Sequence, residues 1–385
     1  MDFDLNDEQK RLQAAAREFA QGVLEPVAAQ LDRSGDQALL LAGLKKLAGL
    51  GLMGLPVRRE YGGAEAGLVA LALVVTEIAR ACASTATVLA LNNMVSEVIQ
   101  SAGSEAQRRA HLPRLCSGEY PAGSFALTEP EAGSDAGSLA TSAVLEGEEW
   151  VLNGCKRFIT SAAFAGVFTI WAVTDPAAPK GRGISLFLAE AGTPGLIVGP
   201  SIPKMGQTAA TASEVAFEDC RLPKSALMGT LNDGFRAAMH GLGVGRIGVA
   251  SLALGIGLAA MDTATRYAGK RLQFGQKISD FQATQWKIAD AYTELEAARL
   301  LVLQAAWGAE QGRSIVRESA MAKLYAAEAA NRACYAALQM LGGNGYTRDY
   351  PLERHARDVR VTSIYEGTSE VQRLVIAREV LKSFA

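Results

Sequence analysis

The chain has 385 residues, of which 49% are hydrophobic and 20% charged, a composition typical of a globular protein with two or three domains. Its 38 basic and 40 acidic residues give a net charge of −2, so no strong field would attract nucleic acid or an anionic membrane. The five cysteines are widely spaced and lack a CxxC pair, which argues against a disulfide framework and a zinc site.

The first third of the chain is predicted to be helical. The start, Met1 to Asp4, is acidic and resembles no signal peptide, so we expect a cytoplasmic protein. Helical spacing of apolar residues continues from residue 6 to about 115, with two more apolar helices at 68–80 and 86–100. We interpret the polar pair Asn92-Asn93 in the latter as a helix–helix hydrogen bond, with a pocket wall as the alternative. We assign residues 1–119 to an N-terminal helical domain.

The middle of the chain changes period. Short β-branched or aromatic segments at 150–154, 167–174, 184–188 and 214–219 are separated by Gly, Pro, Asp and Asn. They predict an antiparallel, barrel-like β domain at 120–230. No helix-length segments alternate with these strands, so a doubly wound parallel sheet is disfavoured.

The last third returns to helical spacing. Helices at 246–270, 288–302 and 316–341 and a C-terminal helix predict a four-helix bundle over 231–385. The apolar run 248–261 is too short and too rich in glycine to predict a membrane span. The expected fold is therefore mainly α, with a central β domain between two helical domains.

Two glycine patterns resemble dinucleotide fingerprints. Residues 243–248 match GxGxxG, and residues 255–260 match its GxGxxA variant. Such a fingerprint requires a preceding strand and a βαβ unit, and both patterns lie within one helical run. We interpret the small residues as close helix packing. The three histidines show no metal-ligand spacing, so no metal site is predicted.

Four loops combine residues that suit a nucleotide or a flavin. The loop 125–135 offers free N–H groups and hydroxyls, and Phe158 and Thr160 lie on one strand face. Glycines at 342 and 343 allow a close backbone or phosphate approach, with a helix C-cap as the alternative. Arg271 and Gln282 flank a turn. Taken alone, each of these segments fits an ordinary structural role at least as well as a ligand site.

A single carboxylate, Glu366, precedes the last predicted helix. Ser369 and Gln372 form a capping-box pattern, which places the helix start at Ser369 and Glu366 on the preceding connection. Alone, a loop glutamate is more often a solvated charge than a catalytic group.

Six ordered blocks resemble those of the acyl-CoA dehydrogenase family, and most closely its short-chain (butyryl-CoA) branch. The blocks are Ala126-Leu-Thr-Glu-Pro-x-Ala-Gly-Ser-Asp, Lys156-Arg-Phe-Ile-Thr, Phe217-Glu-Asp-Cys-Arg-Leu-Pro, Arg271-x-Gln-Phe-Gly, Gln339-x-x-Gly-Gly-x-Gly-Tyr and Ile364-Tyr-Glu-Gly-Thr-Ser-Glu-Val-Gln-Arg. They span practically the whole chain.

The resemblance implies an FAD between the β domain and the C-terminal helices. Its implied contacts are Phe125, Leu127, Thr128, Gly133, Ser134, Phe158, Ile159, Thr160, Thr368 and Glu370. A second set would contact the FAD of a neighbouring subunit in a homotetramer: Arg271, Phe274, Gln282, Gln339, Leu341, Gly342 and Gly343. The implied acyl-CoA contacts are Ser134, Gly243, Arg246, Tyr365 and Gly367.

The resemblance also implies the chemistry. Glu366 would remove the α-proton of a short, possibly branched acyl-CoA while flavin N5 takes the β-hydride, and an electron-transferring flavoprotein would take the electrons. Alternatives are an oxygen-reactive acyl-CoA oxidase and a non-catalytic flavin-binding protein. One branch of the family carries its base at the position of Gly245, so this chain has no rival there.

Three departures from the family pattern bear on the substrate. Gly243 stands where short-chain relatives have Asp, and Thr208 stands where Arg is common. Residues 81–107 contain no Arg or Lys, which favours an uncharged acyl chain. We expect Leu89, Asn92 and Asn93 to set the pocket depth, and the sequence does not fix the acyl chain.

Overall fold

The computed structural model describes residues 4–382 and 384. Its N-terminal part is helical, as predicted. Asn6 accepts a hydrogen bond from the Gln9 backbone N–H and so caps the first helix. The elements are α1 (Asp7–Phe19), a π-helical turn (Ala20–Leu24), α2 (Glu25–Ser34), α3 (Gln37–Gly49), two 3₁₀ turns (Leu52–Gly54 and Arg59–Tyr61), α4 (Gly67–Ala81), α5 (Ala83–Ala102) and α6 (Glu105–Ser117). The two apolar helices predicted at 68–80 and 86–100 are α4 and α5, and both are largely buried.

The Asn92-Asn93 pair is structural, although it bonds to loops and a strand rather than to another α-helix. Asn92 donates to the Met53 carbonyl and accepts from the Gly123 backbone N–H. Asn93 accepts from the Leu55 N–H and donates to the Leu89 carbonyl. Both side chains are fully buried. Each amide therefore satisfies backbone groups that would otherwise be buried without partners.

The central part of the chain is a mixed sheet with strand order β6-β7-β3-β2-β4-β5-β8, and β1 pairs with β4. The strands are β1 (Gly123–Ala126), β2 (Ser142–Glu146), β3 (Glu149–Thr160), β4 (Val167–Val173), β5 (Ile184–Glu190), β6 (Leu196–Ser201), β7 (Ala212–Pro223) and β8 (Leu227–Met228), and a 3₁₀ turn (Lys224–Ala226) precedes β8. Most pairs are antiparallel, as predicted, but β1 and β2 both pair with β4 in parallel. The 40 residues between β1 and β4 are long enough for such a crossover.

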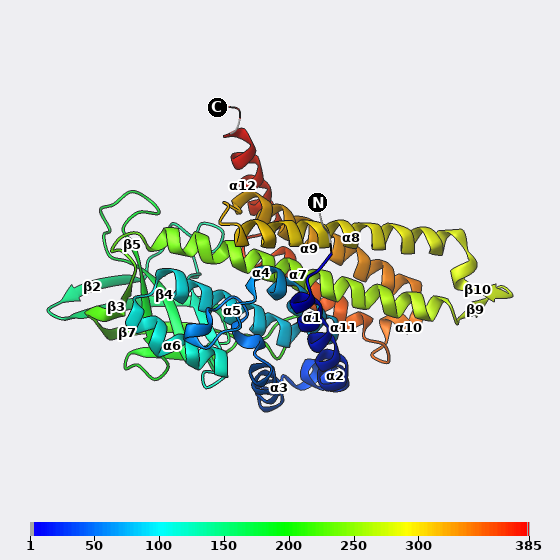
Figure 1. The fold of residues 1–385 in the computed structure, drawn as a ribbon, viewed down its shortest axis with the longest axis horizontal. Coiled ribbons are helices and arrows are strands. Elements are labelled where there is room, and N and C mark those ends of the chain that lie inside the picture. Colours follow the sequence, from blue (N-terminus) through cyan, green and yellow to red (C-terminus); the bar gives the residue numbers. More distant parts are fainter. Residues whose placement is uncertain (1–3, 383, 385) are drawn as a thin grey trace.

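The C-terminal part is again helical. Its elements are α7 (Gly234–Ala268), β9 (Leu272–Gln273), β10 (Gln276–Lys277), a 3₁₀ turn (Ile278–Asp280), α8 (Gln282–Glu310), α9 (Val316–Met340), α10 (Gly343–Tyr346), α11 (Leu352–Arg360), a second 3₁₀ turn (Val361–Ser363) and α12 (Ser369–Leu381). Helices α7, α8 and α9 lie side by side, and α12 leaves their layer and projects from the molecule (Figure 1). The β9–β10 hairpin forms the tip at one end, and the sheet forms the other (Figure 1).

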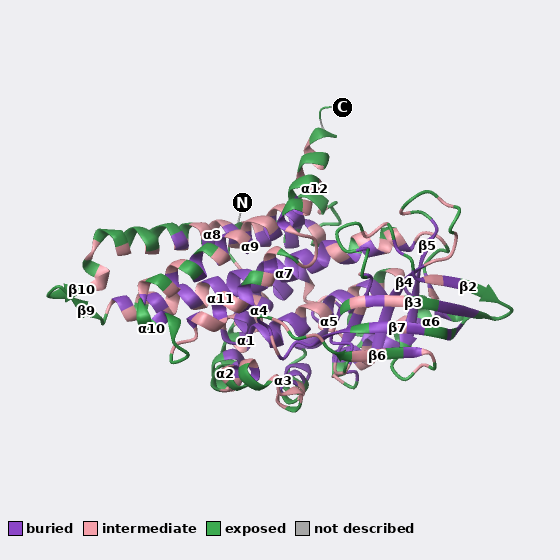
Figure 2. Cartoon of the chain, turned by 180° about the vertical axis from the view of Figure 1, so that it is seen from behind, coloured by how far each residue is buried: buried purple, intermediate pink, exposed green. Residues whose placement is uncertain are grey.

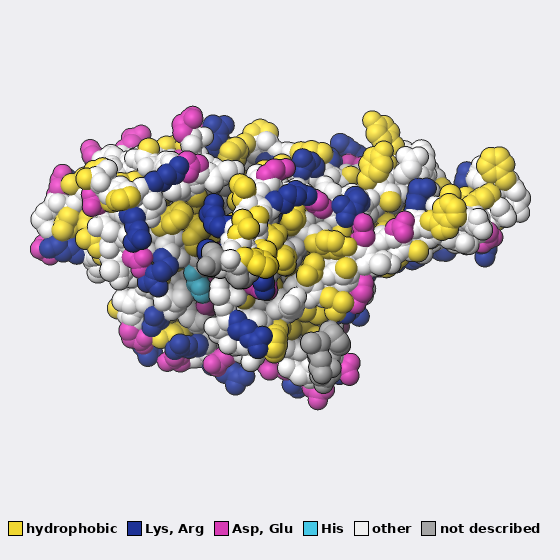
Figure 3. Space-filling view, turned by 90° about the horizontal axis from the view of Figure 1, so that it is seen from above, with side chains coloured by type: hydrophobic (Ala, Val, Ile, Leu, Met, Phe, Trp, Pro, Cys, Tyr) yellow, Lys and Arg dark blue, Asp and Glu magenta, His cyan; other side chains and the backbone are white. Residues whose placement is uncertain are grey.

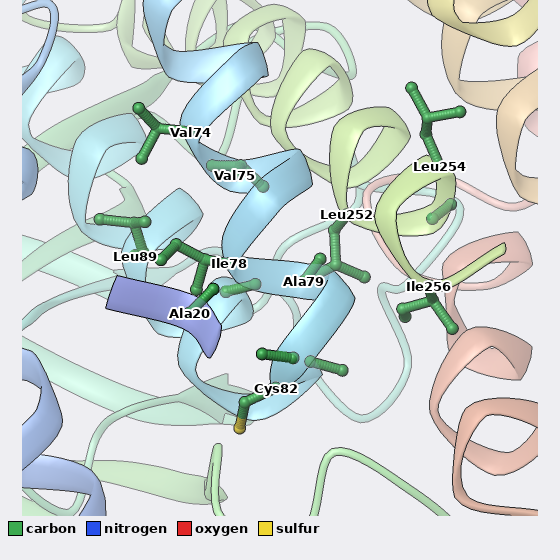
Figure 4. Close-up of a cluster of buried hydrophobic side chains, with 14 of the residues drawn as sticks. Ala20, Val74, Val75, Ile78, Ala79, Cys82, Leu89, Leu252, Leu254 and Ile256 are labelled. Carbon is green, nitrogen blue, oxygen red and sulfur yellow. The ribbon is translucent and has the colours of Figure 1, made fainter. Parts of the chain in front are cut away.

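Helix α7 begins at Gly234, 12 residues before the predicted start at 246. The glycines at 241, 243 and 245 lower the helix propensity of its first turns, so the sequence did not indicate them. Its length and composition alone would suit a membrane span, but 94% of its most apolar window is buried inside the protein. It is therefore the central helix of the core. Side chains from α4, α5 and α7 meet there, among them Ile78, Leu89 and Leu252 (Figure 4).

The glycines of the fingerprint-like pattern at 255–260 serve this packing, as predicted, and in the first pattern Gly248 packs against Ala90 of α5. A Cβ at Gly257 would lie 2.8 Å from the Leu295 side chain, and a Cβ at Gly255 would collide with the Thr76 carbonyl. The small residues thus let α4, α8 and α9 approach α7 closely.

Burial is uneven among the C-terminal helices. Helix α7 is buried along most of its length, whereas α12 and the outer face of α8 are largely exposed (Figure 2). On the face seen in Figure 3, basic and acidic side chains are interspersed, and hydrophobic side chains gather toward the hairpin end. This mixture of charges agrees with the net charge of −2.

Candidate active site

Glu366 lies on the connection before α12, as predicted. Both Glu366 and Gly367 have left-handed backbones, with φ of 54° and 89°. The predicted capping box is wrong by one residue: the N-cap is Thr368, whose side chain accepts from the Val371 N–H, and Ser369 is the first helical residue. Thr368 is also a residue type that caps helices, and with Val371 three residues later it caps α12 without the reciprocal bond of a capping box. Glu370 is exposed on the first turn.

The Glu366 carboxylate points into the protein. Its Oε2 atom is buried and has no hydrogen-bond partner in the described part of the chain. The carboxylate lies over Gly245 of α7, where an added Cβ would be 2.8 Å from Oε2 and would also collide with the sulfur of Met94. Glycine at 245 therefore gives the carboxylate its room.

Burial raises the pKa of the Glu366 carboxyl to about 7, and the positive charges of Arg246 and Lys323 oppose a further rise. Arg246 is buried on α7, and its Nε atom has no partner within residues 4–382. Burial lowers the pKa of the Arg246 guanidinium, and the charge of Glu366 opposes this. A carboxyl with a pKa near neutrality can both accept and donate a proton at physiological pH.

Glu366 forms part of the wall of a small cavity of about 40 Å³. The cavity lies where α5, α7, the end of β3 and the turn before α12 meet, and its lining is mostly apolar. The lining residues are Thr87, Ala90, Leu91, Met94, Thr160, Gly245, Val249, Leu252, Tyr365 and Glu366. Leu89, Asn92 and Asn93 are not among them. Leu89 belongs to the buried helical core, Asn92 bonds to Met53 and Gly123, and Asn93 bonds to Leu55, so the prediction that they set the pocket depth is wrong.

The end of β3 supplies the β-domain side of the site. Register shifts between Lys156 and Ile159 break the regular pairing with β7, and Phe158 takes a left-handed backbone with φ of 59°. The Phe158 side chain is consequently 57% exposed, while Ile159 is buried in the sheet core. Thr160 reaches the cavity. Of these three predicted residues, Ile159 can offer a ligand only its backbone.

The predicted loop 125–134 begins in the core and ends in solvent. The Phe125 ring packs on Trp171 with centroids 4.2 Å apart, and Leu127 is buried. Thr128 is half-buried, and Gly133 and Ser134 are exposed. The loop is thus anchored at its start and open where its N–H groups and hydroxyls would meet a ligand.

A buried ion pair that sequence reasoning missed fixes this loop to β3. Lys156 Nζ lies 2.7 Å from Glu129 Oε1 and also donates to the Leu127 carbonyl. Glu129 accepts in addition from the backbone N–H groups of Ala140 and Thr141. Glu129 and Lys156 stand in two of the blocks quoted above, but their pairing depends on a contact between segments 27 residues apart.

A second polar group supports the turn from the other side. Gln207 accepts from the Thr87 hydroxyl, and its amide lies 3.4 Å from the Tyr365 hydroxyl. Gln207 also donates to the Asp358 carbonyl. Its neighbour Thr208, one of the departures from the family pattern, lies 3.4 Å from the Asp32 carboxylate. No local pattern in the sequence indicates these long-range contacts.

The remaining predicted residues lie at the hairpin end. Phe274 is 95% exposed at the tip of the β9–β10 hairpin, and Arg271 and Gln282 are exposed beside it. Gln339, Gly342 and Gly343 are exposed at the end of α9, whereas Leu341 is buried. Lys323, which contacts Gly367, and Gln339 are 16 residues apart on α9, or about 24 Å along the helix. One chain therefore carries two separate groups of predicted residues.

A larger cleft of about 530 Å³ lies between the N-terminal helices and α11, and none of the predicted site residues line it. Several of its charged side chains pair with one another, as Arg17 does with Glu77 and Arg80 with Asp262. The cleft is thus lined by polar side chains of both charges, unlike the apolar cavity beside Glu366.

Comparison with known proteins covers all three parts of the chain. Models of the acyl-CoA dehydrogenase N-terminal, middle and C-terminal domains match residues 6–119, 124–220 and 232–381. The human mitochondrial short-chain specific acyl-CoA dehydrogenase is 44% identical over 99% of this chain and 92% of its own length. An acryloyl-CoA reductase (NADH) from Anaerotignum propionicum is also 44% identical, over 99% and 96%.

The fold is shared with a solved relative. The butyryl-CoA dehydrogenase of Megasphaera elsdenii superposes with a TM-score of 0.95 at 36% identity, covering 99% of this chain and all of that one. This agreement confirms the predicted order of helical, β-sheet and helical parts. The chain belongs to the acyl-CoA dehydrogenase family and is an oxidoreductase that acts on CH–CH groups.

Proposed function

We propose that this chain oxidises a short acyl-CoA to the trans-2-enoyl-CoA, with Glu366 as the base that removes the α-proton. The observation that carries the proposal is the Oε2 atom of the Glu366 carboxylate, which is buried without a hydrogen-bond partner among the described residues at the wall of an apolar cavity. A carboxylate in that position is dehydrated, which strengthens it as a base toward a weakly acidic C–H group.

The residues around the cavity suit a bound FAD. Phe158 presents an exposed ring beside Thr160, and the nearby Ser161 Oγ is buried without a partner in the described chain. An aromatic face, a hydroxyl and the open N–H groups of Gly133 and Ser134 are the groups a flavin ring and a pyrophosphate require. The start of α12, with Thr368, adds a positive helix end. FAD bound there would supply the acceptor for the β-hydride.

The chain's own residues would then carry out the acid–base part of the reaction. The backbone N–H of Glu366 donates no hydrogen bond within the described residues and would donate to the thioester carbonyl oxygen. That bond stabilises the negative charge which develops on the oxygen as the α-proton leaves. Leu252, Val249 and Met94 would keep water from the carboxylate. Arg246, Gly243 and Gly367 would lie along the acyl-CoA.

The two separate groups of predicted cofactor residues support a multi-subunit arrangement. We propose that the hairpin group around Arg271 and the Gln339–Gly343 segment contact the FAD of a neighbouring subunit, in a homotetramer. The separation of about 24 Å along α9 argues that this group serves a different cofactor from the one beside Glu366. The corresponding domain limits would be 1–119, 120–230 and 231–385.

The cavity volume predicts a preference for short acyl chains. A cavity of about 40 Å³ holds about three water-sized groups, so kcat/KM should be highest for butyryl-CoA and fall steadily for longer chains. The measurement is loss of flavin absorbance near ~450 nm with straight-chain acyl-CoAs, isobutyryl-CoA and 2-methylbutyryl-CoA. Octanoyl-CoA as the best substrate would contradict the proposed pocket, and bleaching by no acyl-CoA would contradict the function.

The pKa of Glu366 predicts a pH dependence. The base must be deprotonated, so kcat/KM should rise with pH through about 7 and then level off. Below that value the rate should fall about tenfold per pH unit, because only the carboxylate form accepts the proton. Anaerobic stopped-flow reduction between pH 5.5 and 9 measures this profile. A flat profile over that range would contradict the assignment.

A second candidate direction, reduction of an enoyl-CoA, is favoured by the likeness to the acryloyl-CoA reductase (NADH). With a pKa near 7, Glu366 could also return a proton to the α-carbon. The physiological electron partner would decide between the two directions. Reoxidation of the reduced enzyme by an electron-transferring flavoprotein, compared with reoxidation in air, also distinguishes a dehydrogenase from an oxygen-reactive enzyme.

A further inference from the structure

The Glu366–Gly367 turn is held by two buried side chains that the proposed chemistry does not use. Gln372 Nε2 donates to the carbonyls of Glu366 and Gly367, at 3.1 and 2.9 Å. Lys323 Nζ, from the middle of α9, donates to the Gly367 carbonyl at 2.6 Å. Both side chains are fully buried. The two carbonyls that a left-handed turn directs inward are therefore satisfied by donors from α12 and α9.

Gly367 is required at this turn for two reasons. Its φ of 89° is a conformation that L side chains rarely adopt. A Cβ there would also lie 2.5 Å from Gln372 Nε2 and would displace the amide from the carbonyls. The close fit between Gly367 and Gln372 indicates that the turn and its donors form one unit.

Lys323 is an unusual residue for its place. It lies on the stripe of α9 formed by Ala320, Ala327 and Ala330, all fully buried, where an apolar residue would pack without loss of hydration. Its hydrogen bond in the described structure goes to a carbonyl rather than to a carboxylate. A buried ammonium is costly, so a lysine at this position needs a compensating role.

The charges around Lys323 come from the turn and from three helices. Glu366 on the turn, Glu370 on α12 and Glu328 on α9 attract the ammonium, and Arg246 on α7 repels it. Burial is the largest influence, and it lowers the pKa of the Lys323 ammonium to about 8. Lys323 is therefore positively charged at neutral pH and acts on the carboxylate one residue before the carbonyl it binds.

We propose that Lys323 and Gln372 are positioning residues, which hold the Glu366–Gly367 turn in its left-handed form, and that Lys323 also favours the carboxylate form of Glu366. The proposal rests on the proposed role of Glu366 as the base. Holding the turn would fix the directions of both the Glu366 carboxylate and the Glu366 N–H. Lys323 and Gln372 would therefore position the base and the carbonyl-binding group together.

Two variants separate the two effects. Lys323→Met removes the donor and the charge, so kcat should fall about 10²-fold, since a displacement of about 1 Å costs that much. The rising limb of its pH profile should also move to higher pH, because a positive charge beside Glu366 is lost. Gln372→Met removes only donors, so kcat should fall without a shift in the profile. KM should change little in both variants. Lys323→Arg keeps the positive charge, so its pH profile should lie close to that of the wild type rather than that of Lys323→Met.

The protonation of Glu366 can be read without turnover. Infrared difference spectra of the oxidised holoenzyme without substrate, with Glu366→Gln as the blank, follow the Glu366 carboxyl as pH is varied. The pH at which half of the Glu366 carboxyl is protonated, its titration midpoint, should rise in Lys323→Met and stay near the wild-type value in Gln372→Met. Lys287→Met, an exposed lysine on α8, is the matched control and should leave the midpoint and kcat unchanged.

The outcomes separate this inference from the proposed function. Wild-type protein that no acyl-CoA bleaches would refute the function before any variant is compared. Active wild type, together with a folded Lys323→Met variant that keeps kcat and the carboxyl midpoint, would overturn the proposal. If Lys323→Met does not fold, Lys323→Arg and Gln372→Met decide: wild-type kcat and an unchanged turn φ in the crystal structure of Gln372→Met would overturn it.

Discussion

Replacing Glu366 by Gln should lower the rate of acyl-CoA oxidation by about 10³- to 10⁴-fold, which is the upper part of the range for a positioned general base. Gln keeps the size of the side chain, so the carboxyl position over Gly245 stays filled and the protein should still fold. It cannot accept the α-proton, and no second carboxylate lines the cavity within residues 4–382. Single-turnover bleaching under anaerobic conditions measures the effect directly.

The control for this prediction lies on the following helix. Glu379→Gln changes the same residue type on α12, where Glu379 pairs with Lys382 away from the cavity. It should leave turnover unchanged, while both variants retain the yellow colour. If Glu366→Gln oxidised acyl-CoA at the wild-type rate, the assignment of the base would be refuted. The paired comparison also tests the hypothesis of a non-catalytic flavin-binding protein, which expects no bleaching by any form.

Replacing Glu129 by Ala should lower the free energy of unfolding by about 3–5 kcal/mol, because it leaves the buried Lys156 ammonium without its counter-charge. The same change removes the acceptor for the N–H groups of Ala140 and Thr141. Burial would raise the pKa of Glu129, but Lys156 and these hydrogen bonds lower it overall. The stabilisation is therefore present at neutral pH and is lost as pH falls through the lowered pKa.

Urea unfolding, followed by the fluorescence of Trp150 and Trp171 in the sheet, measures this loss. The double variant Glu129→Leu with Lys156→Met should recover much of the stability, since it removes both buried charges. Glu146→Ala is the matched control, because its pair with Arg221 is about half exposed and should contribute at most about 1 kcal/mol. Equal losses in Glu129→Ala and Glu146→Ala would contradict the argument.

The order of elements was predictable because it depends on local periodicity. Apolar spacing placed the ends of α4, α5 and α9 within three residues, and β-branched runs placed β4 and β5. The start of α7 was missed, because glycines that serve helix packing also lower helix propensity. The parallel pairing of β1 with β4 was missed, because strand direction depends on a crossover that no local pattern records.

The residues of the candidate site also divide into those that local sequence patterns identify and those that only long-range contacts reveal. Glu366 was found from its block, and its placement before a helix followed from the capping signal. Lys323 was not found, although its position three or four residues from buried alanines on α9 was a usable signal. The contacts of Gln207 with Thr87 and Tyr365 could not be predicted from local patterns, since they join residues 120 and 158 positions apart.

The buried apolar helix α7 has a consequence for synthesis on the ribosome. Its earlier partner, α4, is already made when α7 emerges, but α9 is completed only 72 residues after α7 ends. At 5–20 residues per second that interval is about 4–14 seconds. Throughout it, one side of a helix apolar enough for a membrane stays uncovered. The nascent chain thus presents its most insertion-prone and aggregation-prone segment until α9 arrives to cover it.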